Sequence, residues 1–402
     1  MKVLHVISTL APSYGGPAHA VHAMERALTR RGVEVEIATT DDDGPGRRWS
    51  PGAPGADANA LSQGQARVHR FPKRTDFYKF TPSLATWLRG AVGHYDLVHV
   101  HGLFNFVSIA AARAARRAGV PYVIRPYGTL NHYGMTERRP ALKRWSVRLL
   151  EGPLLRDAAF VHFTAEAERA EAEELLIPMK SVVIPLGIDA SLHAPESAFQ
   201  HFPSLRGRRV VLFLSRISPK KNLEGLLRAF ALTCGEVPDL TLLIVGDGDT
   251  GYTHSVKALA QQLGIADRVV WAGFLEGERK GAALACAELF VLPSFSENFG
   301  IAAVEALMAG VPCVLGTGVA IAHEVASAGA GCDIAPDPQS IAHGMRGILQ
   351  DAALRAEMAK RAQVLARDRF SVDAMGGHLL DLYARVLGTR DRCDRTAQRP
   401  SA

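Results

Sequence analysis

Short runs of β-branched residues alternate with alanine-rich helical stretches along almost the whole chain. In the first half we expect strands at Val3–Ser8, Val33–Thr39, Leu97–His101, Tyr122–Arg125 and Phe160–Thr164. Between them we expect helices at Pro17–Arg31, Pro82–Val92, Ser108–Ala118, Ala141–Arg156 and Glu166–Leu176. In the second half the expected strands are Val210–Ser215, Leu240–Gly246, Val269–Gly273, Leu289–Pro293 and Cys313–Gly316. This alternation predicts the α/β class, with parallel sheets covered by helices on both faces.

A weakly patterned stretch, Ala190–Arg206, separates two runs of this alternation, and we place a linker there. The chain of 402 residues is then divided into two αβ halves of similar size. The stretch Asp43–Ala66 is rich in Gly, Pro and Arg, which predicts a long flexible loop. Ligands of open α/β sheets bind beyond the carboxyl ends of the strands, so two such domains facing each other predict a site in the cleft between them.

Composition excludes several classes of protein. No apolar run reaches the roughly 18 to 20 residues that span a bilayer, and the N-terminus predicts a buried strand rather than a signal peptide. The five cysteines are scattered without CxxC spacing, which favours a reducing, cytoplasmic location over a disulfide framework or a zinc site. A net charge of +6 without a nucleic-acid-binding motif argues against a nucleic acid partner. Part of this charge lies in a tail, Arg390–Arg399, which we expect to be disordered.

The segment from Pro293 to Pro312 carries the strongest functional signal. A strand ends at Pro293, a polar loop follows in which Ser296 or Asn298 suits a helix N-cap, and a helix runs to about Ala309. Free backbone N–H groups near Phe299, Gly300 and Ile301 would form an anion site at the start of that helix. Glu297 lies in the loop and Glu305 lies eight residues later, inside an apolar helical string. A buried carboxylate there needs partners, which sugar or ribose hydroxyls can supply.

The spacing of Glu297 and Glu305 resembles the E-x7-E pattern of the retaining GT-B glycosyltransferases, a group that includes bacterial mannosyltransferases and sucrose synthases. The resemblance extends from Met1 to about Leu387. It implies the GT-B fold, in which two Rossmann-like domains face each other across a cleft. An acceptor-side domain would occupy residues 1–190 and a nucleotide-sugar donor domain residues 200–370, with the terminal helix 372–387 returning to the first domain. Glu305 would hold the ribose of the donor, and Glu297 the transferred sugar.

A second segment, Phe213 to Asn222, resembles the G-R-L-x-x-x-K segment of this family, with Ser215 in place of the usual glycine. Arg216 and Lys221 are its cations, and Lys220 is the weaker candidate of the two adjacent lysines. Two fixed cations in a strand-to-helix loop can bind a nucleoside diphosphate and stabilise the charge that develops on it. The alternative interpretation is a loop with solvated cations.

Glycine-containing turns supply the other expected donor contacts. Gly15 and Gly16 open a helix after the first strand, where glycine allows the backbone to approach a phosphate or sugar closely. Gly246 and Phe274 lie in segments that resemble family sequences near the nucleotide. Both could instead belong to ordinary αβ turns.

Two histidines end the strand Leu97–His101. We expect His99 to be structural and His101 to be a cleft residue with a catalytic role, although a purely structural role is about as well supported. The family often has a histidine after the next strand, close to the transferred sugar, but Tyr127 stands at that place here. A tyrosine does not titrate near neutral pH, so a histidine-based role is in doubt at this position, and Arg125, His132 or His101 are its possible substitutes.

We expect no metal ion and no other cofactor. The run Asp41-Asp42-Asp43 is better explained as a solvated loop, because no other cluster completes an octahedral site. The basic stretch Arg138–Arg156 carries apolar residues between its cations, so it fits either peripheral contact with an anionic membrane, at the inner face of the cell membrane, or an ordinary cationic surface helix.

The sequence therefore predicts a metal-independent enzyme that transfers a sugar from a UDP- or GDP-sugar to a hydroxyl with retention of configuration. A lipid-linked or polysaccharide-precursor glycan fits best as the acceptor, and a soluble acceptor remains an alternative. Two other functions are considered: a nucleotide-sugar epimerase of the same fold, and a non-catalytic module that binds nucleotide sugars. The charged set of Arg216, Lys221, Glu297 and Glu305 argues against both.

Overall fold

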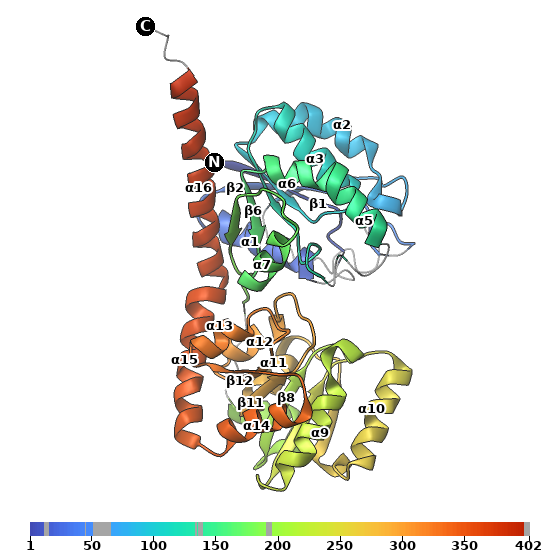
Figure 1. The fold of residues 1–402 in the computed structure, drawn as a ribbon, viewed down its shortest axis with the longest axis vertical. Coiled ribbons are helices and arrows are strands. Elements are labelled where there is room, and N and C mark those ends of the chain that lie inside the picture. The colour runs from blue at the N-terminus through green and yellow to red at the C-terminus, as the bar shows by residue number, and fades with distance from the viewer. Residues whose placement is uncertain are drawn as a thin grey trace. The chain divides into compact units, whose positions relative to one another are not determined.

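The computed structural model describes residues 1–11, 16–44, 46–50, 66–132, 135, 140–189 and 195–397, and the chain divides into two compact units (Figure 1). Unit 1 comprises Met1–Gly187 together with Val372–Ala402, and unit 2 comprises Ile188–Ser371. Each unit is built on one parallel sheet with helices on both faces, as the alternating pattern predicted. No helix in the described part of the chain is both long and apolar enough to cross a membrane.

Unit 1 contains a seven-stranded parallel sheet in the order β3-β2-β1-β4-β5-β6-β7. Its strands are β1 (Lys2–Ile7), β2 (Glu34–Thr40), β3 (Arg67–Phe71), β4 (Leu97–His101), β5 (Tyr122–Arg125), β6 (Phe160–Phe163) and β7 (Ser181–Val183). The five central strands lie within two residues of the predicted bounds. The two edge strands, β3 and β7, were not predicted, because they are short and only half buried and so lack the apolar run that marked the others.

The helices of unit 1 include α1 (Gly16–Thr29), α2 (Pro82–Ala91), α3 (Phe106–Arg117) and α7 (Glu166–Glu173). The N-cap of helix α3 is Asn105, whose side chain accepts a hydrogen bond from Ser108 N at 2.9 Å and so satisfies a free helix donor. Its alanines pack against the sheet, since Ala111, Ala112 and Ala115 are fully buried. Small side chains on that face allow the helix to approach the strands closely.

The helix predicted over Ala141–Arg156 is not continuous. It consists of α5 (Pro140–Ser146), a π-helical turn (Val147–Glu151) and α6 (Gly152–Asp157). The turn carries Glu151 into the protein, where its side chain is fully buried. A π-helical turn inserts one extra residue into the helical repeat, and that shift was not visible in the apolar periodicity.

The terminal helix α16 (Val372–Ala397) belongs to unit 1 and packs on α1. Its Tyr383 hydroxyl lies 2.6 Å from His99 Nδ1 on β4. The helix continues ten residues beyond the predicted end at Leu387, so disorder was wrongly predicted for Arg390–Ala397. Gly388 does not end it, because a glycine in a helix interior costs only about 1 kcal/mol. Most of the predicted loop Asp43–Ala66, namely Pro45 and residues 51–65, lies outside the described residues.

Unit 2 contains a six-stranded parallel sheet in the order β10-β9-β8-β11-β12-β13. Its strands are β8 (Arg209–Leu214), β9 (Leu240–Val245), β10 (Val269–Gly273), β11 (Leu289–Leu292), β12 (Cys313–Gly316) and β13 (Gly331–Ile334). The first five confirm the prediction, whereas β13 was not predicted. Its helices include α9 (Leu223–Cys234), α10 (Thr250–Gln262), α11 (Gly277–Cys286), α12 (Ile301–Met308), α13 (Ala322–Ser327), α14 (Pro338–Leu349) and α15 (Ala352–Phe370).

Candidate functional site

The chain reverses its direction across the sheet of unit 2 between β8 and β11. From β8 it runs outward through β9 and β10, then returns to place β11 on the other side of β8. Ligands of open α/β sheets bind outside the carboxyl ends of the strands at such a switch point. The loops that follow these two strands, residues 215–222 and 293–300, carry five of the predicted donor-site residues: Arg216, Lys221, Glu297, Phe299 and Gly300.

An ion pair and two hydrogen bonds join these loops. The Lys221 ammonium pairs with the Glu297 carboxylate, and Phe295 N donates to Lys220 O at 3.0 Å. The side-chain Nδ2 of Asn222 donates to Pro293 O at 3.2 Å. The motif residues Lys221 and Glu297, 76 positions apart in the sequence, are therefore neighbours in the structure.

The two cations of the first loop differ in their surroundings. Arg216 is exposed, whereas Lys221 is buried, so the alternative of a loop with solvated cations is wrong for Lys221. Burial lowers the pKa of Lys221 to about 8, with further lowering from the charges of Lys220 and Arg216. The Glu297 carboxylate opposes that lowering, because an opposite charge favours the ammonium form. The effect of Arg216 on this pKa also indicates that the two predicted diphosphate-binding cations lie near each other.

Gly246 supports the first loop through close packing. A Cβ atom at Gly246 would lie 1.9 Å from Ser215 O, and Gly246 has φ +135°. Any larger residue would displace the backbone that leads to Arg216. The structure accounts for this glycine by packing alone, so its contact with a donor stays a prediction.

The loop after β11 begins α12 differently from the prediction. Neither Ser296 nor Asn298 is the N-cap; the cap is Gly300, which has φ 95° and no side chain to donate or accept. The left-handed backbone at Gly300 leaves the first N–H groups of α12 without a side-chain cap, as an anion site requires. Ser294 Oγ and Asn298 Oδ1 are also buried without a hydrogen-bond partner among the described residues. Such buried unsatisfied atoms indicate a missing polar partner.

Glu305 is buried, as its place in an apolar string predicted, with 8% of its surface exposed. Its Oε1 atom forms an ion pair with Lys280 Nζ on α11 at 2.7 Å. The sequence did not identify Lys280, which lies in no motif. The sequence indicated such a partner in one way: a carboxylate inside an apolar helix needs a cation or a hydrogen-bond donor nearby.

Two phenylalanines and two glycines are also among the predicted donor contacts. Phe274 is 66% exposed, whereas Phe299 is buried and packs edge-on against Phe370 at a centroid distance of 5.8 Å, so only the backbone of Phe299 is available to a ligand. Gly16 is the first residue of α1, and Gly15 lies outside the described residues.

His101 is not the accessible residue that we predicted. Only 1% of its surface is exposed, because it lies within a cluster of histidines on one face of the unit 1 sheet: His5, His99, His101 and His162. Burial lowers its pKa well below the usual range, with contributions from His5 and Arg125, so it is a neutral imidazole. Its Nε2 lies 3.0 Å from His5 Nδ1, and its Nδ1 lies 2.9 Å from the Tyr127 hydroxyl. His101 can therefore act on a substrate only through Tyr127, which is half-buried.

The histidine cluster is also a group of possible metal ligands within the described part of the chain. Nitrogens of His5, His99 and His101 lie within 4.8 Å of one another. However, His99 already has Tyr383 and His162 as partners, at 2.6 and 3.4 Å. The pKa of His5 is lowered first by burial and then by the positive charge of the buried Arg125. A cation there would meet the same repulsion, so hydrogen bonding accounts for the cluster better than metal binding.

The aspartates of Asp41-Asp42-Asp43 are not arranged as a solvated triplet. Asp42 is 2% exposed and pairs with Lys73 and Lys79. Asp41 accepts a hydrogen bond from Lys73 N at 2.8 Å. The prediction of a solvated loop was wrong for Asp42, because two lysines from the segment after β3 neutralise it.

Two family models match this chain, one in each half. Residues 196–364 match the family described as "Glycosyl transferases group 1", and residues 15–187 match "Glycosyl transferase 4-like domain". The D-inositol 3-phosphate glycosyltransferase of Mycobacterium sp. (strain JLS) is 32% identical over 323 residues, which cover 73% of this chain and 69% of that protein. The chain belongs to the group 1 glycosyltransferases. The matching families and relatives are described as glycosyltransferases, so this protein is a transferase enzyme, and the binding-module and epimerase alternatives are set aside.

One further relative and one solved structure are also similar to this chain. The GDP-mannose:cellobiosyl-diphosphopolyprenol alpha-mannosyltransferase of Xanthomonas campestris is 26% identical over 392 residues, covering 97% of this glycosyltransferase and 98% of that protein. The structure of Anabaena HepE in complex with UDP has a TM-score of 0.76 at 22% identity, with coverage of 96% and 100%. Likeness to such structures confirms the predicted GT-B fold for this glycosyltransferase.

Proposed function

We propose that this glycosyltransferase moves a sugar from a UDP- or GDP-sugar to a hydroxyl group with retention of configuration. Arg216 and Lys221 bind the diphosphate, Glu297 contacts the transferred sugar, and Glu305 holds the ribose. The observation that carries the proposal is the joining of the two loops at the β8/β11 switch point by the Lys221–Glu297 ion pair.

The chemistry proceeds on one face of the sugar. Glu297 is neutralised by Lys221, and an ion-paired carboxylate is a poorer nucleophile than a free one. This pairing favours a step in which the acceptor oxygen bonds to the anomeric carbon from the side that the diphosphate leaves. The leaving phosphate oxygen takes the acceptor proton, and the two cations stabilise the charge that develops on the diphosphate. No metal ion is needed for that stabilisation in the proposal.

A phosphorylated or lipid-linked glycan is the proposed acceptor class. The relatives support it, because one acts on an inositol phosphate and another on a diphosphopolyprenol-linked sugar, according to their names. The same comparisons support two donor nucleotides. One relative is named for GDP-mannose, and HepE was solved with UDP.

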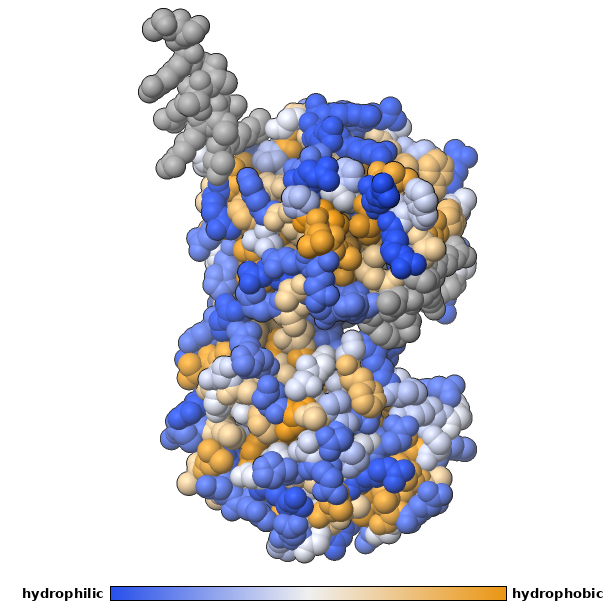
Figure 2. All heavy atoms as spheres, in the orientation of Figure 1, coloured by the Kyte–Doolittle hydropathy of each residue, from blue (hydrophilic) through white to orange (hydrophobic). Residues whose placement is uncertain are grey.

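One face of unit 1 supports peripheral contact with an anionic membrane. Exposed Leu142, Trp145 and Leu149 follow one another at helical spacing along α5 and the π-helical turn. Beside them, α2 and α3 contain no acidic residue and border a groove of about 210 Å³ lined by three arginines: Arg89, Arg113 and Arg117. Figure 2 shows an apolar area among hydrophilic residues over these helices. This combination suits an interfacial surface, where apolar side chains insert and cations meet lipid phosphates.

Two experiments test the proposal. A thermal-shift screen against UDP-, GDP- and ADP-sugars should identify the donor, because a ligand that binds only the folded state raises the melting temperature. Arg216→Ala should abolish that rise, whereas Lys360→Ala on α15 should not. NMR of the product of the identified donor should then show the same anomeric configuration as the donor; inversion would overturn the retaining mechanism.

Membrane contact is tested separately by vesicle sedimentation. Arg144→Glu with Arg148→Glu should reduce binding to phosphatidylglycerol vesicles, since each basic contact contributes about 1 kcal/mol. The control Arg361→Glu with Arg367→Glu, on α15 of unit 2, should bind as the wild type does. Equal binding by both double variants would contradict the membrane surface on α5.

A further inference from the structure

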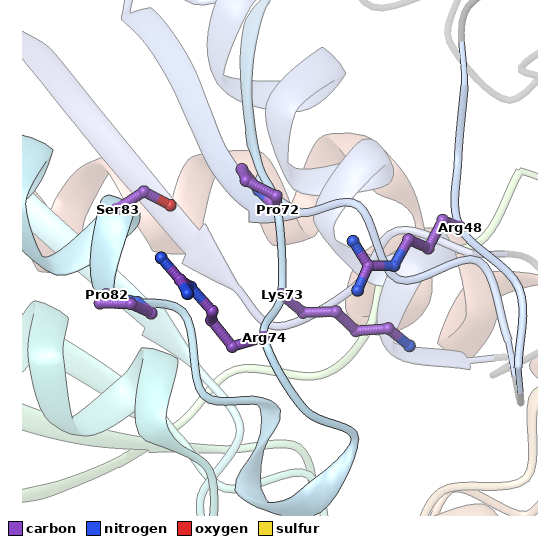
Figure 3. A pocket seen from close by; sticks show the side chains of 6 residues that line it. All are labelled: Arg48, Pro72, Lys73, Arg74, Pro82 and Ser83. Atoms are coloured by element: carbon purple, nitrogen blue, oxygen red, sulfur yellow. The ribbon is translucent and has the colours of Figure 1, made fainter.

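A pocket of about 340 Å³ follows β3 in unit 1, lined by Arg48, Pro72, Lys73, Arg74, Pro82 and Ser83 (Figure 3). Its two arginines lie on opposite sides of the Pro72–Lys73 backbone. The Lys73 ammonium is paired with the buried Asp42. The pocket therefore does not direct its cations at one ligand group, and the histidine cluster is the better ordered polar group of unit 1.

The histidine cluster contains two separate chains of hydrogen bonds. In the first chain, His162 Nε2 lies 2.9 Å from Ile184 O, a carbonyl oxygen that can only accept, so His162 carries its proton on Nε2. His162 Nδ1 then accepts from His99 Nε2 at 3.4 Å, and His99 Nδ1 accepts from the Tyr383 hydroxyl at 2.6 Å. Each proton of this chain has an acceptor inside the protein, so the first chain offers nothing to a ligand.

The second chain joins His5, His101 and Tyr127. His5 Nδ1 lies 3.0 Å from His101 Nε2, and His101 Nδ1 lies 2.9 Å from the Tyr127 hydroxyl oxygen. At the inner end, His5 Nε2 is buried and has no hydrogen-bond partner among the described residues. The two histidines are buried, whereas Tyr127 is half-buried. The chain therefore runs from the interior of unit 1 to a residue that is partly accessible.

The unpartnered nitrogen of His5 decides the direction of this second chain. Burial keeps both imidazoles neutral, because it lowers the pKa of His5 to about 3 and the pKa of His101 well below its usual range. If His101 donated to His5, the His5 proton would sit on Nε2 as a buried N–H group without an acceptor, and such groups are rare in proteins. If His5 donates to His101 instead, its unpartnered nitrogen carries only a lone pair. His101 then carries its one proton on Nδ1 and donates it to the Tyr127 oxygen.

The neighbours of Tyr127 hold it in a defined position. Its φ is 57°, in the left-handed region that residues other than glycine rarely adopt. The Arg125 guanidinium lies 4.7 Å from the centre of the Tyr127 ring, and the next residue, Gly128, donates its backbone N–H to the buried Glu168 carboxylate. Burial raises the pKa of Tyr127 to about 12, so the hydroxyl keeps its proton near neutral pH. A fixed phenol that accepts from His101 directs its own proton away from His101.

We propose that His101 is a positioning residue for the transfer reaction: by donating to the Tyr127 oxygen, it turns the phenolic proton of Tyr127 towards an oxygen of the sugar nucleotide. His5 fixes the tautomer of His101 in turn. The assignment rests on the proposed function, because it names the groups of unit 1 that orient a contact with the same donor substrate. The partner of Tyr127 is an oxygen that accepts a hydrogen bond, such as a sugar hydroxyl, ring or phosphate oxygen.

Nitrogen NMR tests the direction of the chain without any substrate. In the full chain with isotope-labelled histidine, the chemical shifts of the two ring nitrogens show which one carries the proton. The signal that disappears in His101→Asn identifies His101. We expect its proton on Nδ1. A proton on Nε2 would overturn the proposal, whatever the outcome for the proposed function.

Kinetics test the role of His101 in the reaction, by hydrolysis of UDP-glucose or GDP-mannose, whichever the wild type cleaves. Tyr127→Phe and His101→Leu should each lower kcat/KM about tenfold, for the loss of one hydrogen bond. In a Tyr127→Phe background, His101→Leu should have no further effect, because both residues act through the same hydrogen bond. His101→Asn should retain most of the activity, since its amide nitrogen takes the place of Nδ1. The matched control His22→Leu, which replaces another buried histidine on α1, should leave kcat/KM unchanged.

The outcomes separate this proposal from a purely structural role of His101. Losses that add in the double variant would overturn it, because His101 would then act independently of Tyr127. Wild-type kcat/KM in Tyr127→Phe would overturn it as well. If the wild type cleaves neither sugar nucleotide, the proposed function fails, and the NMR measurement still decides the direction of the chain. Circular dichroism shows whether each variant is folded, and His101→Asn replaces His101→Leu in the comparison of tautomers if leucine prevents folding.

Discussion

The Lys221 ammonium pairs with the Glu297 carboxylate, and this ion pair connects the loop after β8 with the loop after β11. The side chains are only 10% and 24% exposed, so each charge depends on the other for compensation. Removing one partner of a partly buried pair leaves the second without its counter-ion, which costs stability as well as function. Substitutions at these two positions should therefore not act independently.

Lys221→Ala and Arg216→Ala should each lower turnover by about 100-fold, because both remove a preorganised charge from the proposed diphosphate site. Their effects on stability should differ. Lys221→Ala should lower the melting temperature, since Glu297 loses its partner, whereas Arg216→Ala should not, since Arg216 is exposed. Steady-state kinetics and thermal unfolding measure the two effects, with Lys220→Ala as the neighbouring control. Near-wild-type turnover in both variants would show that the diphosphate binds elsewhere.

Glu297→Gln and Glu305→Gln should separate the roles of the two glutamates. Glu305 would hold the ribose in both ground and transition states, so its substitution should mainly raise KM, by about tenfold for the loss of one charged hydrogen bond. Glu297 lies beside the reacting sugar in the proposal, so its substitution should lower kcat more than it raises KM. Lys280→Met is the control for Glu305→Gln, because it removes the Lys280–Glu305 pair and keeps the carboxylate. The reverse pattern of kcat and KM would exchange the two roles.

The sequence predicted the elements that bury apolar residues on a regular period, and it failed where side chains are coupled over long distances. The central strands of both units were predicted because buried parallel strands are apolar on both faces. Glu305 was predicted to be buried for the same reason. Its partner Lys280 could not be predicted, since the pairing depends on how α11 packs beside α12. The sequence predicted an accessible His101, but His101 is buried in a cluster of four histidines from three strands. Each of these histidines, taken alone, resembles a polar residue at the end of a strand.

Transfer should survive saturating EDTA. In the proposed mechanism Arg216, Lys221 and the helix N–H groups of α12 do what a divalent ion does for other diphosphate donors. In the run Asp41-Asp42-Asp43, Asp42 already forms ion pairs with Lys73 and Lys79. Activity with and without chelator, followed by addition of Mg²⁺ or Mn²⁺, provides the measurement. Loss of activity in EDTA that either ion restores would contradict a metal-independent reaction.

The buried Glu151 should make the stability of the protein depend on pH. Burial raises its pKa to about 7, although the Tyr78 hydroxyl, Phe104 N and Ser146 Oγ hydrogen-bond to the carboxylate. The folded state therefore holds a proton that the unfolded chain releases near its ordinary pKa of 4.5. The stability that this carboxyl group contributes is fully present below that ordinary value and is lost as the pH rises towards 7. At about 1.4 kcal/mol per pKa unit, the full loss is about 3 kcal/mol.

Glu151→Gln isolates this contribution, because glutamine keeps the shape of the side chain and carries no charge at any pH. Its melting temperature should be nearly independent of pH relative to that of the wild type, and the difference between the two proteins should grow in favour of the variant from pH 5 to pH 8. Thermal unfolding across that range measures the difference, with Glu276→Gln, an exposed carboxylate of unit 2, as the matched control. A constant difference between wild type and Glu151→Gln would mean that Glu151 does not change its protonation in this range.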